Sequence, residues 1–258
     1  MSLDILEQKK DRAVLMIKGL HAAQANALRR VMIEEVPTLA IEEVEFHKNN
    51  TVMYDEIMAH RLGLIPLTTD LKSYMLPNPE NNVQPGDLRS QTTFVLKAKG
   101  PMTITAGEIV FKDPGVKAVF PDMIIVNLLK GQEVEITGTA VLGMGKAHMK
   151  WSPGHVYYRQ RADLAITNVV EGELAQKVVE ACPVNIFTMK GNKAALVKEN
   201  IKDCILCMAC RDLAGIQVEP TDDYYFFIES WGQLDLKAWL TEASKIIQSK
   251  TEELQKKL

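Results

Sequence analysis

Three of the chain's four cysteines lie within seven residues near its C-terminal end. Cys204, Cys207 and Cys210 are separated by two residues each, and the fourth, Cys182, is followed directly by Pro183. Thiolates are soft ligands that select zinc and iron–sulfur clusters. Disulfides are rare in a reducing compartment, so cysteines there indicate metal ligands or reactive thiols. The spacing therefore predicts a metal centre.

The pattern matches one half of a bacterial-type ferredoxin. Such ferredoxins carry C-x2-C-x2-C-x3-C-P, in which the first three thiolates hold one cluster and the fourth, with its proline, reaches across to the other. Counting back from Cys182 and forward from Cys210 at this spacing reaches no further cysteine, so only one cluster has a complete ligand set. The sequence predicts one [4Fe-4S] cluster held by Cys182, Cys204, Cys207 and Cys210.

Several alternatives to this cluster stay open. A [3Fe-4S] form can arise by oxidation, and zinc also accepts four thiolates, although zinc sites usually pair two separated C-x2-C knuckles. A redox C-x-x-C dithiol or a remnant without function also fits. The glycine-rich piece GMGKAH at 143–148 lacks the spacings of a nucleotide site. The cluster is expected to stabilise the fold of the domain that holds it, because the free energy of metal binding contributes to the free energy of folding in small domains.

The composition is that of an ordinary globular protein. Of 258 residues, 47% are apolar and 24% are charged, so the chain can bury a core without cross-links. The formal net charge of -3 lacks the basic excess of a nucleic-acid binder, and no direct specific DNA binding is expected. Without a signal peptide or an apolar run of about 18 residues, a cytoplasmic protein with no membrane segment is expected.

Hydrophobic periodicity and Gly/Pro breaks predict a mixture of strands and helices. The last helix carries a wide apolar stripe that packs either on its own domain or on another chain. The predicted elements are a strand at 12–18, a helix at 21–36, a strand at 38–49, a helix from 54 to Gly63 or Pro66, a loop at 69–90, short strands over 91–142, a hairpin within 184–197, a strand at 223–232 and a helix from 236 onward.

Several segments resemble the α-like subunits of multisubunit RNA polymerases, and the archaeal members of that family most of all. The resemblance covers nearly all of the chain in the expected order, and some members of the family carry a ferredoxin-like insertion. The segments are NALRRVMIEEVP at 26–37, AIEEVEF at 40–46, YDEIMAHRLGLIPLTTD at 54–70, HMKWSPGHVYY at 148–158 and FFIESWGQLDLKAWLTEASKII at 226–247.

The resemblance implies an α+β protein with three parts. These are a discontinuous α-like dimerisation domain at 1–46 and 222–258, an inserted β-rich domain at 47–164 and a ferredoxin-like [4Fe-4S] domain at 165–221. It also implies a non-catalytic scaffold of archaeal DNA-directed RNA polymerase, a nucleotidyltransferase complex. This scaffold pairs with the small α-like subunit L and nucleates assembly with the second-largest catalytic subunit.

No active site of its own is expected, since the sequence has no nucleophile elbow, phosphate loop or magnesium-binding acidic triplet. A ferredoxin-like electron-transfer or redox-sensing protein is the alternative function, and only the cysteines point to it. The resemblance places partner contacts on the first and last helices. The candidates are Asn26, Leu28, Arg29, Arg30, Trp239, Leu240, Ile246 and Ile247.

The alternative for these helices is an ordinary structural role. Adjacent arginines can grip carboxylates of a partner bidentately, but Arg29 and Arg30 can equally form a solvated helix face. The apolar stripe of the last helix can equally belong to the chain's own core.

Overall fold

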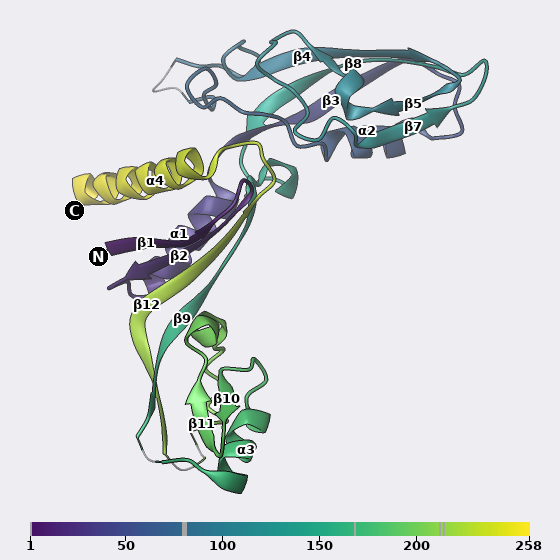
Figure 1. Ribbon diagram of the computed structural model, residues 1–258. Helices are drawn as coiled ribbons and strands as arrows, with labels where there is room; N and C mark the ends of the chain where they lie inside the picture. Colours follow the sequence, from purple (N-terminus) through teal and green to yellow (C-terminus); the bar gives the residue numbers. More distant parts are fainter. Residues whose placement is uncertain (1, 79–81, 168, 212, 214) are drawn as a thin grey trace. The chain divides into compact units, whose positions relative to one another are not determined.

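The computed structural model describes residues 2–78, 82–167, 169–211, 213 and 215–258 of the chain, which Figure 1 shows coloured along the sequence. The elements fall into two compact units. The first unit comprises Met1–Arg29 with Val156–Ile228, and the second comprises Arg30–His155 with Glu229–Leu258. Both contain sheet and helix, so the predicted α+β class is confirmed in its coarse form.

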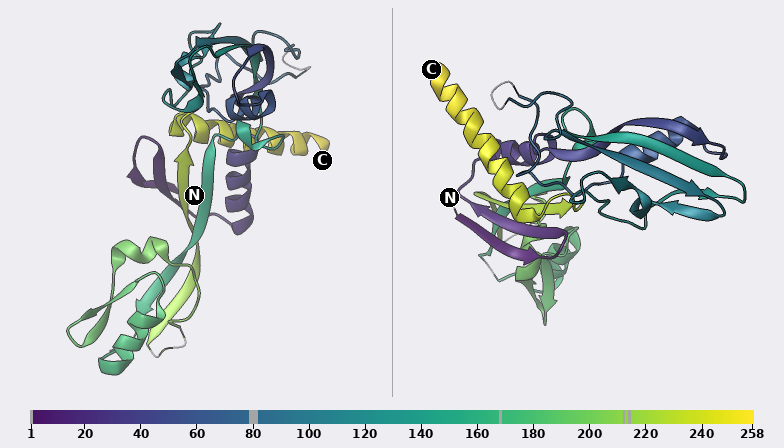
Figure 2. Two further views of the ribbon diagram at one scale, coloured as in Figure 1. Left: turned by 90° about the vertical axis from the view of Figure 1, so that its right-hand side faces the viewer. Right: turned by 90° about the horizontal axis from the view of Figure 1, so that it is seen from above.

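A four-stranded sheet in the order β1–β2–β12–β9 forms the base of the first unit. Long strands β9 and β12 run side by side in it (Figure 2). The predicted strand at 12–18 is confirmed, because Ala13, Leu15 and Ile17 alternate as its buried residues. The strands are β1 (Ser2–Gln8), β2 (Arg12–Lys18), β12 (Ile216–Ser230) and β9 (Gly154–Ile166).

A small helix-and-hairpin module completes the first unit. The predicted hairpin is confirmed, with a two-residue loop in which Gly191 has a φ of 62°, the left-handed conformation that such loops require. Val178, Phe187 and Ile216 contribute to its core. The elements are α3 (Gly172–Ala181), β10 (Phe187–Lys190), β11 (Lys193–Leu196) and the 3-10 helix η4 (Lys198–Asp203).

The second unit holds the predicted β-rich region. Its main sheet has the order β3–β8–β4–β6, β5 pairs with β7, and helix α2 contributes Met58 and Leu62 to the core beneath the sheet. The elements are β3 (Thr38–Asn49), α2 (Asp55–Gly63), β4 (Gln91–Lys99), β5 (Met102–Thr105), η2 (Ala106–Glu108), β6 (Val110–Phe111), β7 (Ile124–Leu128), β8 (Glu133–Gly143) and η3 (Met149–Trp151).

Two helices close to the chain ends complete the fold. Helix α1 (Ala22–Glu34) ends shortly before Pro37, as predicted, and α4 (Leu236–Lys257) begins at Asp235, whose side chain accepts a hydrogen bond of 2.7 Å from the backbone N–H of Ala238. None of the helices that the structure describes is long and apolar enough to span a membrane.

The predicted loop at 69–90 contains turns in its described part, and residues 79–81 lie outside the described residues. The domain boundaries implied by the resemblance stay a prediction. Strands β3, β9 and β12 each run across one of them.

Candidate functional site

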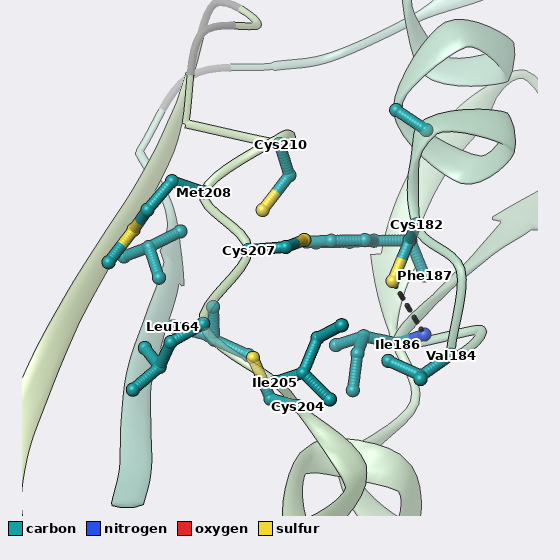
Figure 3. Close-up of a pocket in the computed structure, with 13 residues that line it drawn as sticks. Leu164, Cys182, Val184, Ile186, Phe187, Cys204, Ile205, Cys207, Met208 and Cys210 are labelled. Carbon is teal, nitrogen blue, oxygen red and sulfur yellow. Dashed lines mark hydrogen bonds between the residues drawn. The ribbon is translucent and has the colours of Figure 1, made fainter.

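All four cysteines line a single small cavity in the first unit. Cys182 follows α3, Cys204 follows η4, and Cys207 and Cys210 lie in the loop beyond. Figure 3 shows their sulfur atoms around the space between this loop and the turn that carries Cys182. The remaining wall is almost entirely apolar. It is formed by Leu164, Ala181, Val184, Ile186, Phe187, Ile205, Leu206, Met208 and Val218.

The backbone of the cysteine loop has an unusual conformation. Leu206 and Met208 have φ angles of 52° and 62°, in the left-handed region that residues other than glycine rarely adopt. Leu206 and Met208 lie on either side of Cys207, and their left-handed backbone conformation bends the loop around the cavity. Across from the loop, the backbone N–H of Ile186 donates a hydrogen bond of 3.3 Å to the Cys182 sulfur, a contact of the kind that tunes thiolate-ligated clusters.

Burial raises the pKa of two of the four thiols in the cavity. Burial raises the pKa of the Cys204 thiol, and the neighbouring Cys182 and Cys207 raise it further. Burial also raises the pKa of Cys210, again with contributions from the other three cysteines. None of the four, all of them among the described residues, forms a disulfide. A nearby positive charge would therefore favour the thiolate forms of Cys204 and Cys210.

The side-chain positions do not form a closed site for a single ion. Among the residues that the structure describes, no three His, Cys, Asp or Glu groups come together in a way that could hold a metal ion. A tetrahedral zinc site with Zn–S bonds of about 2.3 Å brings its sulfurs to about 3.8 Å from one another. The donor set of four thiols, the apolar wall and the N–H donor fit a larger thiolate-bound group. The metal itself stays a prediction.

Two ion pairs hold the segment just before Cys204. Arg159 on β9 donates hydrogen bonds of 3.2 and 3.1 Å to the backbone oxygen and the carboxylate of Asp203, and its guanidinium lies 5.2 Å from the ring centre of Phe227. Lys202 forms an ion pair with Glu7 on β1. Sequence reasoning missed these contacts, because Arg159 and Glu7 are 44 and 195 residues away from their partners.

The candidate residues of helix α1 interact mainly within the helix. Arg29 donates two hydrogen bonds, of 3.2 and 3.0 Å, to the side-chain oxygen of Asn26, and Arg30 donates to both carboxylate oxygens of Glu34 one turn later. Leu28 is half-buried. Arg30 is exposed, with 57% of its side chain accessible, and therefore offers the clearest free surface of the four candidates.

The candidate residues of helix α4 divide into two groups. Trp239 is fully buried and donates a 2.8 Å hydrogen bond from its indole Nε1 to the backbone oxygen of Met32 in α1. It therefore joins α4 to α1 and presents no accessible surface. Leu240, Ile246 and Ile247 are only half-buried. An apolar surface thus stays open on the helix.

The insert domain of the second unit defines the class of protein. Residues 43–155 match the family described as the RNA polymerase Rpb3/RpoA insert domain. The match covers β3 from Glu43 onward, α2 and the remaining strands of the main sheet. The chain therefore carries the inserted domain of the α-like subunits of RNA polymerases.

Comparison along the whole chain narrows this class to one family. The chain is 35% identical to DNA-directed RNA polymerase subunit Rpo3 of Methanosphaera stadtmanae, over 98% of this chain and 97% of the relative. It is 33% identical to Rpo3 of Pyrococcus horikoshii over 98% and 95% of the two chains, and 35% identical to that of Pyrobaculum calidifontis over 97% and 94%. The chain belongs to the Rpo3 family of archaeal RNA polymerase subunits.

These relatives confirm the resemblance stated from the sequence. They give no support to the alternative of an electron-transfer or redox-sensing protein, since all three are polymerase subunits by name.

Proposed function

We propose that the protein is a non-catalytic scaffold subunit of an archaeal DNA-directed RNA polymerase. In this proposal it pairs with a small α-like partner, subunit L, and the pair nucleates assembly with the second-largest catalytic subunit in the cytoplasm. One observation carries the proposal, namely identity of 35% to a polymerase subunit over 98% of the chain. Similarity over the full length, rather than over one domain, favours a shared place in the same assembly.

The accessible apolar surface of α4 supports the pairing with a partner. Leu240 and Ile247 are seven positions apart, two helical turns, and therefore lie on the same face of the helix. Both are half-buried, and Leu254, another seven positions on, is 59% exposed. An apolar stripe left open on a helix fits a second chain that covers it.

Co-expression with the small α-like subunit of the same organism tests the pairing. A tagged chain should elute from size exclusion as a heterodimer with one copy of each subunit, and light scattering should give the summed mass. The double variant Leu240→Glu, Ile247→Glu should dissociate. A matched control is Ser249→Glu, which adds charge to an exposed position of the same helix. A stable monomer with no affinity for the small subunit contradicts the proposal.

We also propose that the cysteine cavity holds one [4Fe-4S] cluster. The support consists of four thiols on a single cavity, an apolar wall and an N–H donor to one sulfur. When bound, the cluster supplies iron–thiolate bonds that cross-link the loop at 204–210 to the turn after α3. The chain's own residues shape the cavity and give it an apolar wall. Arg159 and Lys202 hold the approach to Cys204.

Anaerobic purification tests the cluster directly. Iron and sulfide analysis should give about four of each per chain, with an EPR signal on reduction, and Cys207→Ser should lose both. Met208→Leu is the matched control, because it alters the same loop without removing a thiol. Three irons per chain, or zinc without sulfide, would instead identify the alternatives named above and overturn the [4Fe-4S] assignment.

A further inference from the structure

The outward face of the main sheet in the second unit is hollowed into an open groove of about 780 Å³. Strands β3, β8 and β4 form it, and no other described element is needed to complete it. Carboxylates, threonines and apolar groups meet there. The lining residues are Glu42, Glu43, Val44, Glu45, Thr93, Phe94, Val95, Thr137, Gly138 and Thr139.

A β-bulge concentrates negative charge along one wall of the groove. The register of β3 against β8 shifts between Ile41 and Glu43, so one extra residue is inserted and the strict alternation of faces is broken. Ile41 is buried, whereas Glu42 and Glu43 are both exposed, and Glu45 is exposed after the half-buried Val44. Without the bulge, adjacent residues of a strand would point to opposite faces.

The cross-strand register places the rest of the groove beside this acidic wall. Glu43 pairs with Thr139, which pairs in turn with Thr93. In the next outward row, Glu45 pairs with Thr137, and Thr137 pairs with Val95. Threonines therefore form the floor between the carboxylates and an apolar rim.

The far rim of the groove, at Val95, continues into a second exposed apolar side chain. Val95 is 39% exposed, and Val110 of β6, which pairs with it, is 68% exposed. The groove has three glutamates and no lysine or arginine among the described residues that line it. Lys150 pairs with Glu42 from outside the groove, and the imidazole of His47 lies 3.9 Å from the carboxylate of Glu45. Glu43 and Glu45 supply the remaining carboxylates of the groove.

We propose that this groove docks a lysine- or arginine-bearing segment of another subunit of the polymerase, an inference that rests on the proposed function. Charge complementarity identifies the occupant, because carboxylates attract cationic side chains and repel the phosphates of a nucleic acid. The long stems of lysine and arginine suit the threonine floor and the valine rim, since these stems pack on apolar surface while their charged ends reach the carboxylates.

An ordinary solvated sheet face is the simpler explanation for exposed polar residues, because antiparallel sheets often turn one face to water. Three features of the groove are not expected of an ordinary solvated sheet face. The face is hollow, its charges have one sign, and a bulge brings two consecutive glutamates to the same side.

Charge reversal in the assembled polymerase tests the inference. The double variant Glu43→Lys, Glu45→Lys changes two exposed side chains and should fold as the wild type does, which circular dichroism checks. Its affinity for the remaining subunits, measured by reconstitution at increasing salt, should fall about tenfold or more, since each surface ion pair contributes modestly. Asp122→Lys is the control, an exposed charge reversal in the same domain but outside the groove.

Zero-length carbodiimide cross-linking of the wild-type polymerase gives a second measurement that does not depend on the variant. Glu43 or Glu45 should become linked to a lysine of another polymerase subunit. Equal assembly of the variant and the control, with neither glutamate cross-linked, overturns the groove proposal alone, and so does a cross-link to a second copy of this chain. Failure of the wild-type chain to enter the polymerase at all refutes the proposed function instead.

Discussion

Replacement of Trp239 by phenylalanine should weaken the attachment of α4 to α1. The α1 helix ends at Glu34, so the backbone oxygen of Met32 is one of the four carbonyls that a helix cannot satisfy internally. The Trp239 indole supplies its hydrogen bond, at 2.8 Å, from a fully buried position. Phenylalanine fills most of the same space but has no donor.

The magnitude follows from two contributions. A buried carbonyl left without a partner costs about 1–3 kcal/mol, and the smaller ring leaves a partial cavity worth about 1 kcal/mol more. The expected loss is therefore about 2–4 kcal/mol. For a chain of this size the melting temperature should fall by about 5–10 °C.

Hydrogen exchange measured by mass spectrometry locates the effect. Peptides from α1 and α4 should exchange at least about 30-fold faster in Trp239→Phe, the equivalent of 2 kcal/mol. Trp231→Phe provides the matched control, because Trp231 is 43% exposed and its loss should cost under about 0.5 kcal/mol. Equal melting temperatures and equal exchange in the two variants would refute the assignment of Trp239 as the link between the helices.

Three further predictions concern other parts of the chain. Tyr74 donates a 2.6 Å hydrogen bond to Asp113. The pKa of its phenol is raised to about 12, mainly by burial and secondly by this hydrogen bond to the carboxylate. The folded state thus keeps a proton that the unfolded state loses above about pH 10. Stability should decline more steeply between about pH 10 and 12 in the wild type than in Tyr74→Phe, because Tyr224 and Tyr225, whose pKa values burial also raises, remain in both. At pH 8 this variant should be about 1–2 kcal/mol less stable by urea unfolding. Arg159→Ala removes the contact with Asp203 and should speed amide exchange over residues 198–210 about three- to tenfold, whereas unchanged exchange would show that the ion pair is dispensable. Gly143→Ala would place a methyl group 2.4 Å from an indole carbon of η3, so the melting temperature should drop by several degrees, and an unchanged value would contradict the packing described.

Strand β2 was predictable from the sequence, and its neighbour β1 was not. Residues 13–17 form a continuous apolar run, and β2 lies inside its sheet, with a neighbour on each side. The adjacent strand β1 lies at the sheet edge, where Leu3, Ile5 and Leu6 are all at least 43% exposed. The pattern of apolar residues in a sequence reflects which residues are buried. A strand that is exposed on both faces therefore gives no pattern from which it could be predicted.

The cysteine site was likewise predictable from the sequence in part and visible only in the structure in part. The spacing of Cys204, Cys207 and Cys210 predicts a single loop with three converging thiols, and the Cys–Pro pair indicates a fourth ligand from elsewhere. The structure brings all four to one cavity, while the identity of the metal stays a prediction. The anchors of that loop were beyond the reach of the sequence, because Arg159 and Glu7 reach it only through the pairing of distant strands.

The sequence by itself determined the family, several of the strands and helices and the candidate thiol ligands, because these depend on residue identity and on short-range spacing. Only the tertiary structure decided that Trp239 is buried against α1, that the segment before Cys204 is held by two ion pairs, and that a bulge turns two consecutive glutamates to one face of a sheet. Each of these depends on strand register or on helix packing. Both are set by contacts between residues far apart in the chain, which local patterns do not encode.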